Sequence, residues 1–318
     1  MSLANGEGVM EVEAAAAGDR SDDNVVIHLN DLHFTYCGPD GLPLRGTPPL
    51  FTGLDWKVEK GSRVLLIGAN GAGKTTVMKI MAGKHMVERE QCKILGESPF
   101  HATDLTSSGR LSYIGGTWQR DIAFAGYNIP LQGDFSALKM IEGIQGVDKA
   151  RRERLVKVLD IDPAWRMHTV SEGQRRRVQL CIGLLKEFEV LFLDEVTVDL
   201  DVLGRADLMN FLREECEQRE CTIIYATHIF DGLEAWPTHL AFFADGEMKI
   251  NEPSSSFPEL AEGRLVNLVA AWLRDHEKEM ESRPKGQKRE FKYLSNNGWG
   301  SGRSNLTIKL SSNAVWRC

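Results

Sequence analysis

A glycine-rich stretch between an apolar run and an amphipathic segment most constrains the fold of this chain. Residues 68–75 read Gly-Ala-Asn-Gly-Ala-Gly-Lys-Thr, which fits the pattern G-x-x-x-x-G-K-[ST]. The preceding run, 63–67, is mostly apolar and suits a buried strand. Val77, Ile80 and Met81 follow at helical spacing. A strand, a glycine loop and a helix in this order place the helix N-terminus where it can hold phosphate groups.

The residue types in this loop are those that a phosphate site needs. Glycines let several backbone N–H groups converge, Lys74 adds a positive charge for the β- and γ-phosphates, and the Thr75 hydroxyl can ligate Mg²⁺. A glycine-rich turn without a ligand is the alternative, and the flanking strand and helix argue against it. The predicted nucleotide-binding residues of this loop are Gly68, Ala69, Asn70, Gly71, Ala72, Gly73, Lys74, Thr75 and Thr76.

A pair of carboxylates follows a second apolar run. Residues 190–193 read Val-Leu-Phe-Leu, and Asp194 and Glu195 come directly after them. Ligands of open α/β sheets bind beyond the carboxyl ends of the strands, so Asp194 is predicted to hold Mg²⁺ together with Thr75. Glu195 is predicted to be the general base, with Lys74 also in the catalytic set. Two exposed acids that merely end a strand are the alternative.

A third motif, at 169–177, separates one family of phosphate-binding proteins from the others. Ser171, Gly173 and Gln174 are followed by three arginines and by apolar residues at helical spacing. Here the chain resembles the ABC ATPases, whose signature reads L-S-G-G-Q, and the spacing from Ser171 to Asp194 matches that family. The resemblance implies that these three residues bind nucleotide and that Ser171 takes part in catalysis. An ordinary serine N-cap is the alternative.

Three weaker elements fall where the ABC family has them. Residues 198–201 resemble its D-loop, and His228 resembles the histidine that contacts the γ-phosphate, so His228 joins the predicted catalytic set. A histidine that only caps a strand is the alternative. Tyr36 falls where the family carries an aromatic ring that stacks on adenine, although packing of Tyr36 against Phe34 alone remains open.

The chain also departs from the family pattern. Val170, Glu172 and Val196 stand where the family carries Leu, Gly and Pro. Aligning 111–115 with the strand before the family's glutamine loop places Gly116 or Thr117 at the glutamine position. Gln119 lies two or three residues later, and either it replaces that glutamine or the usual Mg²⁺ contact is missing.

Composition excludes several classes of protein. Of the 318 residues, 42% are hydrophobic and 26% are charged, as in ordinary globular proteins, and the net charge of −7 argues against nucleic acid as the partner. The six cysteines form no C-x-x-C pair, which favours reduced thiols and a cytoplasmic location, with nuclear or peripheral membrane association through a partner left open. No apolar run is long enough to span a bilayer.

The domain organisation follows from these motifs. We expect a disordered leader at 1–24, an ABC ATPase domain at 25–255 with a helical subdomain at about 120–178, an amphipathic C-terminal helix at 256–282, and a flexible Gly/Ser/Asn-rich basic tail at 283–318. Apolar patterning predicts strands at 25–36, 50–67, 111–114, 190–193 and 222–227, helices at 136–144, 148–159 and 263–281, and a hairpin at 240–250 that turns at Asp245 and Gly246.

The resemblance implies a fold and a mode of action. The fold is α/β, a P-loop NTPase core of ABC type with an antiparallel β subdomain and a helical insertion. The cofactors are ATP and Mg²⁺, and ATP is closed between two head-to-tail subunits, in a homodimer or with a related ABC subunit. The chain resembles the plant and fungal subfamily without membrane domains (plant subfamily I), which implies an ATPase that acts on a protein partner. A nucleotide-binding subunit of a multi-chain transporter is the main alternative, and a catalytically silent scaffold is a third.

Overall fold

The structure is a computed structural model that describes residues 24–38, 42–43, 48–115 and 135–282. The predicted leader up to residue 23, the predicted tail (283–318) and the segment 116–134, with Gly116, Thr117 and Gln119, lie outside the described residues.

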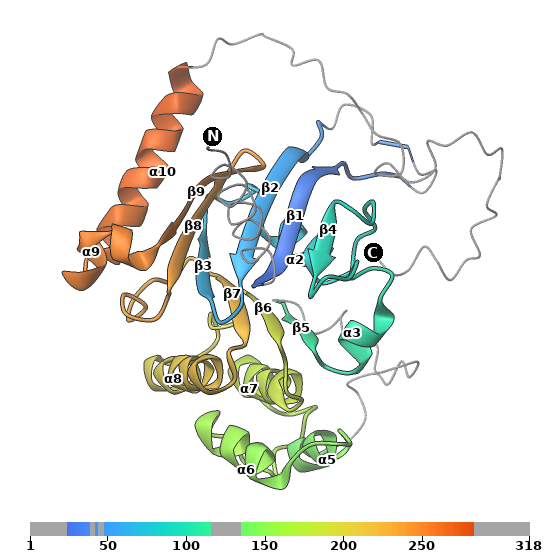
Figure 1. The fold of residues 1–318 in the computed structure, drawn as a ribbon. Helices are drawn as coiled ribbons and strands as arrows, with labels where there is room; N and C mark the ends of the chain where they lie inside the picture. The colour runs from blue at the N-terminus through green and yellow to red at the C-terminus, as the bar shows by residue number, and fades with distance from the viewer. Residues whose placement is uncertain (1–23, 39–41, 44–47, 116–134, 283–318) are drawn as a thin grey trace, which may run out of the picture.

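A small antiparallel sheet forms the upper layer in Figure 1, with strand order β2-β1-β4. Every pairing in this sheet is antiparallel, as the sequence predicted for the β subdomain. Its inward side chains, among them Ile27, Leu29 and Trp56, are buried. The strands are β1 (Val25–Phe34), β2 (Phe51–Glu59) and β4 (Cys92–Ile94).

A six-stranded sheet forms the centre of the protein, with strand order β5-β6-β7-β3-β8-β9. All neighbours are parallel except β8 and β9, which form the predicted hairpin. The hairpin turns at Asp245 and Gly246, both with positive φ, as the Asp-Gly pair predicts. The strands are β3 (Arg63–Ile67), β5 (Leu111–Ile114), β6 (Val190–Asp194), β7 (Thr222–Ala226), β8 (His239–Ala244) and β9 (Glu247–Pro253).

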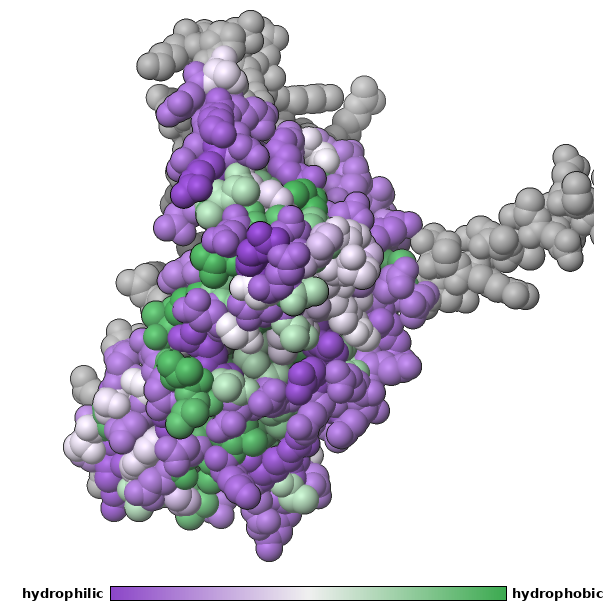
Figure 2. Space-filling view, turned by 90° about the vertical axis from the view of Figure 1, so that its left-hand side faces the viewer, coloured by the Kyte–Doolittle hydropathy of each residue, from purple (hydrophilic) through white to green (hydrophobic). Residues whose placement is uncertain are grey.

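Helices cover both faces of the central sheet. In Figure 1, α7 and α8 lie below it, α5 and α6 form a further layer beyond them, and α10 runs along the β8–β9 hairpin. Seen from the α10 side, the surface is mostly hydrophilic, with hydrophobic residues gathered toward its lower left (Figure 2). The helices are α2 (Lys74–Met81), α3 (Thr103–Ser107), α5 (Ala137–Glu142), α6 (Lys149–Val158), α7 (Glu172–Leu184), α8 (Val202–Arg219), α9 (Pro258–Ala261) and α10 (Leu265–Ser282), and a 3-10 turn spans Ser254–Ser256.

The central strands divide the core because alternate side chains point to opposite faces. In β6, Leu191 and Leu193 pack with the helices below the sheet, whereas Val190 and Phe192 pack with α2 and the antiparallel sheet. All five residues of β6 are buried, as expected of a parallel strand covered on both faces. This packing fixes the carboxyl end of β6, where Asp194 lies.

Most predicted elements are present, with three differences. The predicted strand at 50–67 is two strands joined by a turn with Gly61 at φ 75°. The strand predicted at 25–36 ends at Phe34, and Tyr36, which lies beyond it, is 40% exposed. Pairing of β1 with β2 stops at Phe34, which frees the chain to turn there. The sequence did not predict β4, α3 or α8.

No helix in the part of the chain that the structure describes is long and apolar enough to cross a membrane.

Candidate functional site

The glycine loop connects β3 to α2 through backbone conformations that only glycine adopts easily. Gly73, at φ 109°, is the N-cap of α2, and a Cβ there would lie 2.9 Å from a ring carbon of Phe51. A Cβ on Gly68 would lie 2.1 Å from the carbonyl oxygen of Phe243. These two close approaches hold the loop against the ends of β2 and β8, and any side chain at either glycine would push it away.

The N-terminus of α2 carries no side-chain cap within the described residues. A helix N-terminus presents unpaired N–H groups and the positive end of the helix dipole, so this one is suited to an anion. Lys74 Nζ donates hydrogen bonds to the carbonyl oxygens of Gly68 (2.6 Å) and Ala69 (3.1 Å). Burial lowers the pKa of Lys74 from its ordinary value, while the carboxylates of Glu195 and Asp194 act in the opposite direction.

The hydroxyl and the carboxylate that the sequence assigned to Mg²⁺ lie side by side. Thr75 Oγ1 donates to Asp194 Oδ1 at 3.2 Å, and Tyr113 Oη donates to Asp194 Oδ2 at 3.0 Å. Asp194 is buried. Such oxygen groups suit Mg²⁺, which proteins often hold through one or two side chains and the phosphates of the substrate. In the described ranges, no group of three or more His, Cys, Asp or Glu side chains is placed so that it could hold a metal ion.

Glu195 follows β6 in a strained left-handed backbone conformation, with φ 52°. Its N–H donates to the carbonyl oxygen of Ala226 at the end of β7, at 3.0 Å. Its Oε2 lies 2.8 Å from His228 Nδ1, although the contact lacks hydrogen-bond geometry and Oε2 is a buried atom without a hydrogen-bond partner among the described residues. Two of the four side chains that the sequence predicted to be catalytic, Glu195 and His228, are therefore in contact.

Ser171 caps α7 through a capping box. Its Oγ accepts from Gln174 N at 3.2 Å, and Gln174 Oε1 accepts from Ser171 N at 2.9 Å. A Cβ on Gly173 would lie 2.8 Å from the carbonyl oxygen of Asp199, so the signature turn packs closely on the predicted D-loop. The Glu172 side chain is exposed and lies 3.6 Å from Arg175 Nη1, one turn along the helix.

Tyr36 lies next to the first turn of α2. Its Oη is 2.7 Å from Thr76 Oγ1, and its ring makes edge contacts with the rings of Phe34 and His85, at centroid distances of 5.2 Å and 5.9 Å. Burial, helped by Lys79 and Lys84, lowers the pKa of His85 to about 4, so its ring is neutral at pH 7. Packing against Phe34, the alternative kept for Tyr36, is thus present, and one side of the tyrosine remains exposed.

The structure brings together the glycine loop, the pair of acids and His228, all at the carboxyl ends of β3, β6 and β7. The sequence did not predict the contacts of Tyr113 with Asp194 and of His85 with Tyr36. The position of Tyr113 in the strand beside β6 is a signal for the first, because parallel neighbours end at the same edge of a sheet. His85 carries no such signal.

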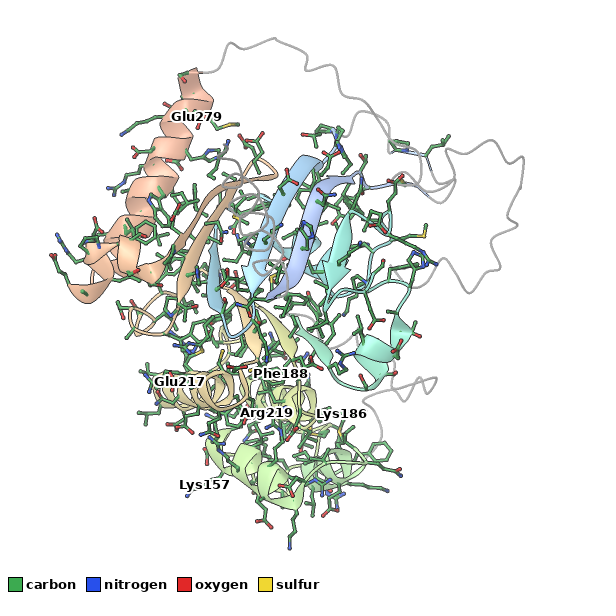
Figure 3. The ribbon with its side chains drawn as sticks, viewed as in Figure 1. Lys157, Lys186, Phe188, Glu217, Arg219 and Glu279 are labelled. Atoms are coloured by element: carbon green, nitrogen blue, oxygen red, sulfur yellow. The ribbon has the colours of Figure 1, made fainter. Side chains whose placement is uncertain are left out.

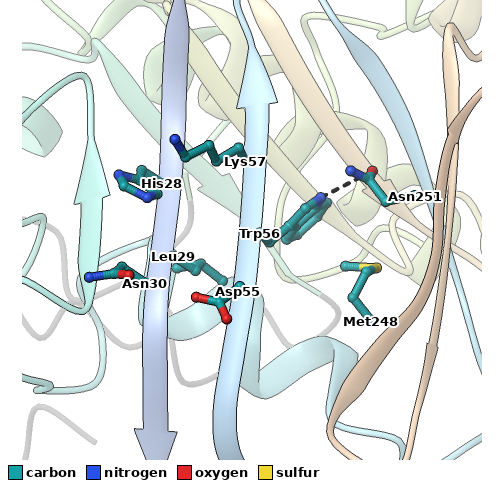
Figure 4. A pocket seen from close by; sticks show the side chains of 8 residues that line it. All are labelled: His28, Leu29, Asn30, Asp55, Trp56, Lys57, Met248 and Asn251. Carbon is teal, nitrogen blue, oxygen red and sulfur yellow. Dashed lines mark hydrogen bonds between the residues drawn. The ribbon is translucent and has the colours of Figure 1, made fainter. Parts of the chain in front are cut away.

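A separate pocket of about 580 Å³ lies between the antiparallel sheet and β9. Figure 4 shows Trp56 and Asn251 in its wall, joined by a hydrogen bond of 3.2 Å from Trp56 Nε1 to Asn251 Oδ1, with His28 and Lys57 farther along. None of the predicted nucleotide-binding or catalytic residues lines it.

Known proteins are similar in sequence to most of this chain. A family model described as ABC transporter matches residues 51–198. The chain is 50% identical over 318 residues to ABC transporter I family member 20 of Arabidopsis thaliana, covering 92% of this chain and 97% of that protein. It is 38% identical over 239 residues to CCR4-associated factor 16 of Saccharomyces cerevisiae, covering 70% of this chain and 80% of that one.

A solved structure supports the fold. A dimeric ATP-binding cassette in a post-hydrolysis state, bound to ADP and Pi, aligns with a TM-score of 0.57 at 18% identity, over 73% of this chain and all of that one. At this identity the likeness concerns the fold alone. Together with the matching family model and the identity to plant and yeast proteins, it shows that the chain belongs to the ABC family and is an ATPase with a P-loop α/β fold.

Proposed function

We propose that the chain hydrolyses ATP in a dimer that closes around the nucleotide and acts on a protein partner. The observation that carries the proposal is the contact of Glu195 with His228 beside the open N-terminus of α2. Phosphate-binding donors, a metal-binding pair and a candidate base thus lie at one edge of one sheet.

In this proposal each residue has a defined task. The N–H groups of 68–76 and Lys74 hold the phosphates, Tyr36 stacks on the adenine, and Thr75 and Asp194 hold Mg²⁺, which neutralises charge on the phosphates when bound. Glu195 accepts a proton from the water that attacks the γ-phosphate, and His228 orients the Glu195 carboxylate toward that water.

A second copy of the chain completes the site. We propose that Ser171, Gly173 and Gln174 of one subunit approach the γ-phosphate held by the other, so that a homodimer has two equal sites. Val202 and Leu203, directly after the predicted D-loop, are 78% and 77% exposed, and burial of such apolar side chains favours association. The related solved cassette is described as dimeric.

The partner is proposed to be another protein in the cytoplasm. The yeast relative, of which this chain covers 80%, is named for its association with CCR4. The alternative, a nucleotide-binding subunit of a multi-chain transporter, is favoured by the name of the Arabidopsis relative. Affinity purification from native extract with and without ATP distinguishes these two functions. A polytopic membrane protein that binds in a fixed ratio supports the transporter subunit, whereas a globular partner that binds only with ATP supports action on a protein partner.

The dimer is tested with Glu195→Gln, which keeps the shape of the side chain but cannot take up a proton. With Mg²⁺ and ATP this variant should lose turnover, retain nucleotide and elute at twice the mass of the chain in light-scattering chromatography. Glu187→Gln, a similar change at an exposed acid paired with Arg219, is the matched control and should behave like the wild type. A Glu195→Gln protein that stays monomeric with bound ATP would count against the shared site.

A further inference from the structure

Arg176 is a buried arginine in the first half of α7, two residues after the signature motif. Its guanidinium donates to three backbone carbonyl oxygens in two other segments. Nη1 donates to Gly115 at 2.7 Å, Nε to Val196 at 3.2 Å and Nη2 to Glu195 at 3.2 Å. One side chain thus joins the signature helix, the end of β5 and the turn that carries Glu195.

The burial of this charge has a physical cost that its contacts must offset. Burial lowers the pKa of Arg176, although an arginine side chain remains protonated in proteins. Gln179 Oε1 accepts a further hydrogen bond from Nη1 at 2.5 Å, so the guanidinium is also bound to a residue of its own helix. A planar guanidinium can serve three carbonyls in fixed directions, whereas a lysine ammonium or an amide cannot.

The carbonyl of Glu195 is one of these three acceptors, and the backbone of Glu195 is strained. A non-glycine residue at φ 52° persists only when its surroundings hold it there. The N–H of Glu195 is held by Ala226, its carbonyl by Arg176, and the next carbonyl, of Val196, by Arg176 again. Without the guanidinium, the N–H bond to Ala226 is the backbone hydrogen bond of Glu195 that remains among the described residues, so the turn is freer to relax.

We infer that Arg176 is a positioning residue for hydrolysis, which fixes the backbone of Glu195 so that its carboxylate faces His228 and ties this geometry to the signature helix. The inference rests on the base role proposed for Glu195. Arg176 acts through the backbone and does not touch the nucleotide. Arg176 therefore links the position of α7 directly to the backbone of the proposed base.

A purely structural role is the competing explanation, and the chain supplies a matched control. Arg151 is a partly buried arginine whose side chain is 9% exposed, and it holds the other end of α7 through hydrogen bonds from Nε to the carbonyls of Leu184 (3.1 Å) and Leu185 (3.0 Å). Its Nη1 donates to Glu215 at 2.6 Å. Arg219, labelled in Figure 3, donates to the same carboxylate at 3.0 Å. This cluster lies at the contact of α6 with α8, and neither Asp194 nor Glu195 takes part in these hydrogen bonds.

The experiment compares Arg176→Gln with Arg151→Gln in the full chain, by steady-state ATP hydrolysis, ATP binding and thermal unfolding. Arg176→Gln should lower kcat about 10- to 100-fold, the loss expected from hydrogen bonds to a charged group, with KM and ATP affinity changed less than about threefold. Arg151→Gln should lower the melting temperature and leave kcat close to that of the wild type. Equal losses of kcat in the two variants would overturn the inference.

Two further measurements keep the result decisive. If Arg176→Gln does not fold, Arg176→Lys retains the positive charge but lacks the planar guanidinium group. It should show the same fall in kcat at unchanged KM, and wild-type turnover in this variant would refute the inference. Millimolar guanidinium should restore part of the turnover of Arg176→Ala and none of that of Glu195→Gln, and equal effects on both would refute it. Wild-type turnover in Glu195→Gln would instead reject the base role of Glu195 in the proposed function.

Discussion

The sequence predicted that two helix N-termini, those of α2 and α7, bind phosphate, and the two differ in whether a side chain caps them. α2 begins after Gly73, and within the described chain no side chain caps it. α7 begins after Ser171, which forms a complete capping box with Gln174. Ser136, Asp148 and Asp201 likewise cap α5, α6 and α8. Among these five helices of the described ranges, α2 alone lacks a side-chain cap, and the shorter helices α3 and α9 lack one too.

The difference in capping indicates that the N-termini of α2 and α7 have different roles. A missing cap costs a helix about 1 kcal/mol, and an anion bound at that end can supply the lost hydrogen bonds. α2 is therefore arranged for its ligand, whereas α7 satisfies its own N-terminus and keeps the Ser171 O–H as a donor. We expect the affinity for nucleotide to come from the α2 side and the signature turn to act on turnover.

The largest expected effect comes from blocking the α7 side with Ser171→Arg. Turnover should fall by about a hundredfold or more, the size of effect seen when a donor to a transition-state oxyanion is removed, while ATP affinity stays within about threefold of the wild type. Ser136→Arg replaces the serine cap of α5 and is the matched control for lost helix stability. Equal loss of ATP binding and turnover in Ser171→Arg would show that both helix ends bind nucleotide within one chain.

Lys74→Met tests the role of the α2 N-terminus in nucleotide binding. Removal of the ammonium should weaken ATP binding about 10- to 100-fold, because a charge-assisted hydrogen bond to phosphate is lost. Lys79→Met changes the basic residue of the last turn of the same helix and should bind ATP normally. Calorimetry with ATP measures both, and wild-type affinity in Lys74→Met would remove α2 as the main source of binding.

The secondary structure near both helix ends was predictable because each element carries a local signal. β3 and β6 are short apolar runs, and Ser171 with Gln174 is a recognisable start of a helix. α8 carries a signal that was missed: Leu208, Leu212 and Cys216 recur every four residues and are buried, although the exposed Leu203 lies outside this stripe. β4 has three residues, too few to show a period.

The motif residues of the site were predictable, but the contacts that orient them were not. Three consecutive arginines suggest a solvated stretch, and Arg175 and Arg177 do pair with exposed acids. Arg176 differs because it lies one and two turns before the buried Leu180 and Leu184. That spacing is a usable signal for burial, but its carbonyl partners come from residues 61 and 19 or 20 positions away in the chain, which only the tertiary structure shows.

A smaller effect is expected at Tyr36, which lies next to the first turn of α2 and is proposed to stack on the adenine. Tyr36→Ala should weaken ATP binding about five- to tenfold, as loss of one aromatic–base stack predicts, and leave the affinity for tripolyphosphate unchanged. Tyr36→Phe removes the contact with Thr76 but keeps the ring, and it should bind ATP almost normally. If both variants lost affinity equally, the hydroxyl contact, not the ring, would be the important feature of this residue.

The smallest effect is expected at Glu172, the acidic residue in the first turn of α7 where the family carries glycine. Its exposed side chain lies near Arg175 and so does not need to face the γ-phosphate, where an anion would be repelled. Glu172→Gly restores the family residue but adds backbone freedom, worth about 1 kcal/mol in a helix interior and less in the first turn. Glu172→Gln removes the charge alone and is the better control. Both should change turnover by less than about threefold, because a single exposed ion pair contributes little to stability or orientation. A rise in turnover of orders of magnitude in either variant would mean that the Glu172 carboxylate faces the shared site and lowers its turnover. The N-terminus of α7 would then inhibit hydrolysis in the wild-type protein.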